Sequence, residues 1–92
     1  MPETQADILV TGRVQGVGFR DFTERAAWRL HLSGRVRNRS DGAVHIIVEG
    51  PEETVQEFLT QIRRGPSASR VTDLAITWGA ATGRFNDFTT DF

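Results

Sequence analysis

Two kinds of hydrophobic pattern divide the first third of the chain. In residues 7–14 the even-numbered positions are apolar or glycine and the odd-numbered ones are mostly polar, which predicts a strand with one buried face. Residues 20–32 instead have apolar side chains at helical spacing, including Phe22 and Leu30, with charged residues between them. We therefore expect an amphipathic helix that ends near His31.

Alternation returns in residues 33–50 and is interrupted by the sequence Arg-Ser-Asp-Gly at 39–42. An Asp-Gly pair is typical of the tight turn of a β-hairpin, so the stretch predicts two antiparallel strands. In the second of these strands Val44, Ile46 and Val48 share one face, which we expect to be buried.

The stretch 51–64 contains the signals of a complete helix. Pro51 suits the first helical position, and the two glutamates and two arginines near the ends match the helix dipole. Gly65 suits a left-handed cap, and the proline after it stops the helix. The predicted buried stripe consists of Val55, Leu59 and Ile62.

Two further strands are predicted, one at 71–79 and a short one at 85–92. The order strand, helix, strand, strand, helix, strand, with a terminal strand added, predicts a ferredoxin-like α+β fold. We expect an antiparallel sheet with both helices on one face and a short extra C-terminal strand, in a single domain over residues 1–92. Trp28 and Trp78 are interpreted as core or edge aromatics.

Composition narrows the classes of function. The chain is 38% hydrophobic and 25% charged, which is ordinary for a folded globular protein. With 11 basic and 12 acidic residues its net charge is −1, so it has no general attraction for nucleic acid or anionic membranes. The absence of cysteine excludes a thiol nucleophile and a thiolate metal site. Without a secretory signal or a long apolar run, we expect a cytoplasmic protein with no nucleic-acid or membrane partner.

The first candidate site is the sequence Gln-Gly-Val-Gly-Phe-Arg at 15–20, between the first strand and the first helix. Free amides and the positive end of the helix dipole meet there, which suits an anion. Gly16 and Gly18 permit a concave arrangement of amides, and Arg20 can bind a phosphate through two hydrogen bonds. The spacing matches neither a P-loop nor a dinucleotide-binding motif, so a small phosphate fits better than a nucleotide. The alternative interpretation is a structural turn followed by a solvated arginine.

Two longer motifs carry a resemblance to a known family. Residues 12–20 and 34–50 resemble the first and second signatures of the acylphosphatases, and the resemblance extends over nearly the whole chain. It implies a small stand-alone enzyme, monomeric and independent of metal and cofactor, that hydrolyses acyl phosphates to a carboxylate and inorganic phosphate. It also implies catalytic roles for Arg20, which binds phosphate, and Asn38, which positions water. The implied phosphate-binding loop consists of Gln15, Gly16, Val17, Gly18, Phe19 and Arg20.

The chain departs from the family pattern at two positions. Arg35 stands where an aromatic residue is common, which bears on the packing of that surface and on the acyl groups that are favoured. His31 stands where many members have glycine at the end of the first helix, and we expect it to adopt a left-handed conformation. We also expect Gln15 to order the loop through its side chain.

Other interpretations compete at single residues. Without Arg20 and the family motif, Asn38 is interpreted as a hairpin residue next to the Ser-Asp-Gly turn. His31 and His45 are interpreted as solvated or partly buried imidazoles, and Asp21 as a favourable charge at the helix start rather than a general base. An RNA-binding module of the same fold is disfavoured because the strand at 43–50 has no aromatic residue. A non-catalytic phosphate-binding regulatory module is the alternative function, distinguished by binding without turnover.

Overall fold

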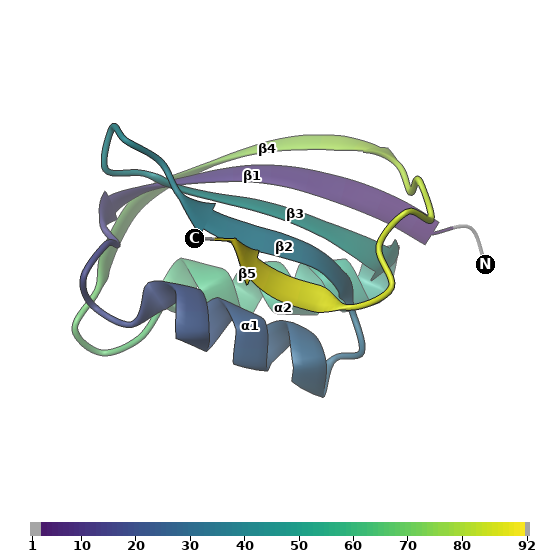
Figure 1. Cartoon of the computed structure of the whole chain (residues 1–92), viewed down its shortest axis with the longest axis horizontal. Coiled ribbons are helices and arrows are strands. Elements are labelled where there is room, and N and C mark those ends of the chain that lie inside the picture. The colour runs from purple at the N-terminus through teal and green to yellow at the C-terminus, as the bar shows by residue number, and fades with distance from the viewer. Residues whose placement is uncertain (1–2, 92) are drawn as a thin grey trace.

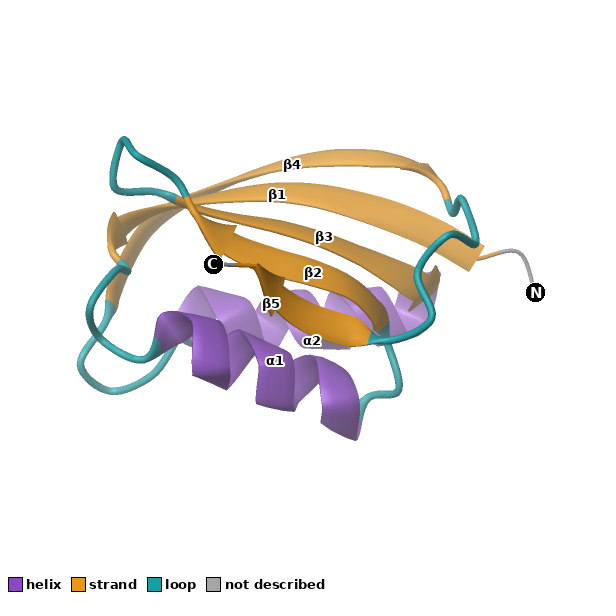
Figure 2. Ribbon diagram, in the orientation of Figure 1, coloured by secondary structure: helices purple, strands orange, loops and turns teal. Residues whose placement is uncertain are grey.

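A computed structural model describes residues 3–91 of the chain. Both helices lie on one face of a single five-stranded sheet, and the other face is uncovered (Figures 1 and 2). This arrangement confirms the predicted ferredoxin-like fold. Within residues 3–91, neither helix is long and apolar enough to cross a bilayer. In chain order the elements are β1 (Glu3–Arg13), α1 (Phe19–Arg29), β2 (Ser33–Asn38), β3 (Val44–Pro51), α2 (Glu52–Arg64), β4 (Arg70–Ala80) and β5 (Phe88–Asp91).

The strands are arranged in the order β4-β1-β3-β2-β5. The first four pair antiparallel, but β5 pairs parallel with β2, so the sheet is mixed and the expected antiparallel sheet needs this correction. The parallel pairing follows from the directions of the strands. Because β4 runs opposite to β2, the turn at 81–87 reverses the chain and leaves β5 running in the direction of β2. In Figure 1 this turn crosses from one edge of the sheet to the other.

The first strand is longer than its hydrophobic pattern indicated. β1 begins at Glu3 rather than at residue 7, because Glu3 pairs with Pro51 of β3 and Thr4 pairs with Ala80 of β4. Backbone pairing on both sides therefore extends the strand beyond the alternating region. The strand lies between β4 and β3, and the chain leaves it at Arg13, directly before the candidate loop.

The core lies between the sheet and the two helices. The predicted buried positions of β3 and the stripe of α2 are confirmed, and each buried aliphatic side chain there contributes about 1.5–3 kcal/mol to folding. Phe58 joins the α2 stripe and packs against Phe88, with ring centroids 6.2 Å apart. Neither tryptophan belongs to the core. Trp28 is 53% exposed on α1, and Trp78 is 41% exposed on the edge strand β4.

The helix ends confirm some signals and correct others. His31 has φ 57°, as expected, and the Leu32 amide donates to the Ala27 carbonyl at 2.9 Å, which closes α1 in a Schellman-type cap. Pro51 precedes the first helical residue of α2 instead of occupying it, because β3 continues through Pro51. Gly65 has a positive φ of 65°, but its ψ of 177° is extended rather than left-handed.

Candidate active site

The loop between β1 and α1 has the backbone shape of an anion site. Gly16 and Gly18 have φ values of 73° and 79°, which glycine adopts without strain. Gly18 is the N-cap of α1 and offers no side chain to the first amides of the helix. A Cβ added at either glycine would meet no atom within 4 Å, so the space in front of the loop is open. The start of α1 therefore presents amides and the positive end of its dipole to this space.

A pocket of about 260 Å³ lies in front of the loop. Gly16, Gly18, Phe19 and Arg20 line it from the loop and the first turn of α1, and Asn38 lines it from the end of β2. The structure thus brings together the two predicted catalytic residues, although they lie on different elements. The β1–α1 loop, which precedes Arg20, and the β2–β3 hairpin, which follows Asn38, lie at the same end of the molecule (Figure 2).

Two of the predicted loop residues do not line this pocket. Val17 is half-buried and packs against the core. Gln15 points its side chain to the β2–β3 hairpin, where Nε2 donates to the carbonyls of Arg39 at 2.7 Å and Ala43 at 2.9 Å. These contacts are of the kind expected of a side chain that orders the loop, a role that stays a prediction. These two bonds also fix the loop relative to the hairpin that follows Asn38.

The hairpin turn is held by its own polar contacts. The Arg39 amide donates to the Ala43 carbonyl at 2.8 Å, and the Ala43 amide donates to Oδ1 of Asp41 at 3.1 Å. Hydrogen bonds from the Arg39 side chain and from the Ala43 amide hold the pKa of Asp41 below its usual range. The carboxylate therefore remains an acceptor in the turn at neutral pH, and the end of β2 is held in place.

Asn38 ends β2, where it pairs with Val44 of β3, and its side chain is half-buried. Its Oδ1 atom is buried and accepts no hydrogen bond from the described part of the chain. An unsatisfied buried acceptor costs about 1–3 kcal/mol, so such atoms are rare in folded proteins. The hairpin interpretation of Asn38 does not explain this cost, because a residue with only a turn-forming role would bond to the turn.

Sequence reasoning did not consider two polar residues that line the pocket, Glu24 on α1 and Thr90 on β5. The Thr90 hydroxyl donates to Oε2 of Glu24 at 2.9 Å. Glu24 follows Arg20 by four residues, so helical spacing alone places both on one face of α1. Thr90 had no comparable signal, because its position depends on how β5 pairs with β2.

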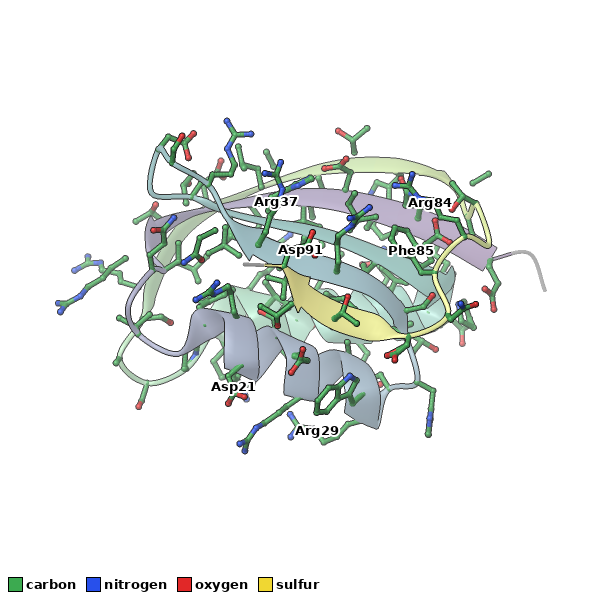
Figure 3. The ribbon with its side chains drawn as sticks, viewed as in Figure 1. Asp21, Arg29, Arg37, Arg84, Phe85 and Asp91 are labelled. Atoms are coloured by element: carbon green, nitrogen blue, oxygen red, sulfur yellow. The ribbon has the colours of Figure 1, made fainter. Side chains whose placement is uncertain are left out.

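Two residues outside the pocket also have defined partners. Arg35, which departs from the family pattern, pairs with Asp91 at 3.3 Å and lies over the ring of Phe85, 5.5 Å from its centroid. Figure 3 labels both partners, Phe85 in the turn at 81–87 and Asp91 at the end of β5. His45 is partly buried, as expected, and its Nε2 lies 2.8 Å from Oδ1 of Asp7. Among residues 3–91 no group of three His, Cys, Asp or Glu residues is arranged to hold a metal ion.

Comparison with known proteins decides the family. The acylphosphatase family model matches residues 6–90. The chain belongs to the acylphosphatase family. An acylphosphatase of Syntrophotalea carbinolica is 44% identical over 92 residues, the full length of both chains. The crystal structure of the acylphosphatase of Bacillus subtilis superposes with a TM-score of 0.94 at 40% identity, covering 97% of this chain and 99% of that one.

A longer protein contains a similar domain. The structure of full-length HypF in its phosphate- and nucleotide-bound form matches with a TM-score of 0.87 at 32% identity, over 100% of this chain and 12% of that one. The comparisons confirm the predicted family and the expected acylphosphatase enzyme class. The roles of individual residues, among them those of Arg20 and Asn38, stay predictions.

Proposed function

We propose that the pocket in front of the β1–α1 loop is the site at which this chain hydrolyses acyl phosphates. The phosphoryl group lies against the amides of residues 15–20 and the guanidinium of Arg20, and Asn38 orients the attacking water. The observation that carries this proposal is the convergence of the glycine loop, Arg20 and Asn38 on one pocket. Membership of the acylphosphatase family supports the reaction class.

The chemistry requires little of the protein beyond binding and orientation. The water oxygen attacks phosphorus, the bond between phosphorus and the acyl oxygen breaks, and its electron pair leaves with the carboxylate. A carboxylate is a stable leaving group, so no general acid is required. Amides and Arg20 neutralise charge on the phosphoryl oxygens as the bond breaks. The proton of the water passes to the phosphate, because the amide of Asn38 cannot act as a base near neutral pH.

The orphaned oxygen of Asn38 supports its role in this scheme. Rotation of the side-chain amide exchanges its oxygen and its NH₂ group, so the same residue can accept from a water and donate to a phosphate oxygen. Occupation of the pocket would then supply the donor that Oδ1 lacks within the described chain. The cost of that unsatisfied acceptor is thus relieved when substrate and water are bound.

The test is hydrolysis of benzoyl phosphate by the purified protein in the presence of a chelator. We expect turnover by the wild type and a loss of at least about 100-fold in kcat/KM for Arg20→Ala and in kcat for Asn38→Ala. Arg63→Ala and Asn86→Ala are matched controls, since both residues are exposed and lie outside the pocket. A large rise in KM with kcat preserved in Asn38→Ala would contradict the water-positioning role.

The same experiment separates the enzyme from the regulatory module. A folded wild type that binds phosphate but does not turn over would assign the loop to ligand binding alone, a function that the similarity to a domain of HypF also accommodates. We further propose that the chain acts without metal or cofactor as a cytoplasmic monomer of one domain. Activity that chelator removes and added Mg²⁺ restores would contradict the metal-independent reaction.

A further inference from the structure

The pocket contains a carboxylate that the proposed reaction does not use. Glu24 is half-buried, lines the pocket with Arg20 and Asn38, and lies one helical turn beyond Arg20 on α1. An acidic side chain beside a phosphate site weakens the binding of every anionic ligand, so its presence requires a reason. The contacts of Glu24 and of its acidic neighbour show how far this charge is exposed to a ligand in the pocket.

The carboxylate of Glu24 is held in place by a neutral partner. Thr90 of β5 donates its hydroxyl hydrogen to Oε2 at 2.9 Å, which orients the group without neutralising it. Within the described range 3–91, no Lys, Arg or His nitrogen lies within 4.0 Å of this carboxylate. The negative charge of Glu24 is therefore positioned but not compensated by an ion pair from these residues.

Asp21, the other acidic residue of the pocket wall, is different. Its side chain is 65% exposed and pairs with Arg25 at 3.1 Å. Figure 3 shows Asp21 projecting from the first turn of α1 away from the sheet. Solvent and the ion pair both weaken its field in the pocket. Of the two acidic side chains that line the pocket within residues 3–91, Glu24 is therefore the one with the stronger field at a bound acyl phosphate.

We propose that Glu24, oriented by Thr90, is a specificity-determining residue that selects against acyl phosphates carrying a second negative charge on the acyl group. Acyl phosphates with a neutral or positively charged acyl group are the favoured substrate class. The inference rests on the proposed function, because it requires that the phosphoryl group lies on the loop. The acyl group then occupies the rest of the same pocket or its mouth.

The size of the pocket sets the magnitude of the expected repulsion between Glu24 and a second charge on the substrate. A sphere of 260 Å³ is about 8 Å across, so a second anionic group that lies within the pocket is at most roughly that distance from the Glu24 carboxylate. Two unit charges at about 8 Å, in an effective dielectric of about 20 to 80, change an equilibrium about twofold to thirtyfold. Repulsion of the phosphoryl group itself is common to all acyl phosphates and cancels when two substrates are compared as a ratio.

The experiment compares butyryl phosphate with succinyl phosphate, which have acyl chains of similar length but differ by one carboxylate. The quantity measured is the ratio of their kcat/KM values, succinyl over butyryl, for the wild type and for Glu24→Gln. We expect the variant to raise this ratio about twofold to thirtyfold, and the increase to shrink at high salt. Glu57→Gln, which removes an exposed charge from α2, is the matched control and should leave the ratio unchanged.

A second variant tests the role of the hydroxyl. Thr90→Val keeps the charge of Glu24 but removes the hydrogen bond that orients it, and should raise the ratio by less than Glu24→Gln does. An unchanged ratio in both folded variants, or an equal rise in Glu57→Gln, would overturn the inference. Failure of the wild type to hydrolyse butyryl phosphate would instead contradict the proposed function, so the two outcomes are distinguishable.

Discussion

Replacement of Gln15 by leucine should slow the reaction without abolishing phosphate binding. The side chain of Gln15 lies outside the pocket, yet it donates to two carbonyls of the β2–β3 hairpin, at Arg39 and Ala43. It thereby connects the loop that we propose holds the phosphoryl group to the strand end that carries Asn38. The change to leucine keeps most of the side-chain volume and removes both donors.

The structure limits the expected loss of stability. A hydrogen bond contributes about 0.5–1.5 kcal/mol net, so the loss of two corresponds to about 1–3 kcal/mol. The lower part of this range is favoured, because the Ala43 carbonyl keeps the Arg39 amide and the Arg39 carbonyl keeps the Gly42 amide, at 2.8 Å and 3.3 Å. For a domain of this size the melting temperature should fall by roughly 5–15 °C.

The effect on turnover follows from positioning. A misplacement of about 1 Å between reacting groups can cost on the order of 100-fold in rate, so we expect kcat for benzoyl phosphate to fall about 10- to 100-fold in Gln15→Leu. KM should change little, because the loop amides and Arg20 remain. Gln5→Leu is the control. The side chain of Gln5 donates a hydrogen bond of 2.7 Å to Glu49, and neither residue lines the pocket. Equal losses of kcat in both variants, measured well below their melting temperatures, would refute the positioning argument.

Two further predictions concern stability. His31→Gly should raise the free energy of unfolding by up to about 1 kcal/mol in denaturant titrations, because glycine adopts the left-handed φ of 57° without the strain that a side chain brings. Burial alone would raise the pKa of Glu49, but hydrogen bonds from Thr82, Gln5 and Gly83 outweigh it and hold the pKa below 4.5. The stabilisation by this carboxylate is therefore present above pH 4.5 and lost as the pH falls through the lower folded value. Glu49→Gln should lower stability at neutral pH by about 1.5–3 kcal/mol and reduce this acid dependence, as thermal melts at several pH values can show.

Local patterns predicted most of the fold because each helix or strand buries only one of its faces. Alternation marked β1 and β3, and helical spacing with terminal charges marked α2, so order and type of element followed directly. The direction of β5 did not follow, because it depends on the turn at 81–87. That turn is held by Glu49, whose carboxylate accepts from the amides of Thr82 and Gly83 at 2.9 Å and 3.1 Å. A contact between residues 33 positions apart has no local signal.

The candidate site was predictable to the extent that it depends on backbone and motif. Two glycines next to an arginine at a helix start indicate an anion site by residue type and spacing alone. The wall formed by Glu24 and Thr90 was not predictable, because these residues lie 66 positions apart and meet through β5. Of the two interpretations of the tryptophans, core or edge, the edge position holds for Trp78 on β4. The exposure of Trp28 on α1 did not follow from the helical period, which does not specify which face a neighbour covers.

Strand direction explains why the pocket contains these residues together. β1 and β2 both run antiparallel to β3, so they share a direction and end at the same end of the sheet. The loop of residues 15–20 follows the end of β1, and Asn38 is the end of β2. Because β5 runs parallel with β2, it also ends there and places Thr90 in the wall of the pocket. An antiparallel β5 would have carried its last residues to the opposite end of the sheet and left Glu24 without its hydroxyl partner. The parallel pairing of β5, whose direction the sequence did not predict, is therefore also what makes the proposed selectivity of the site possible.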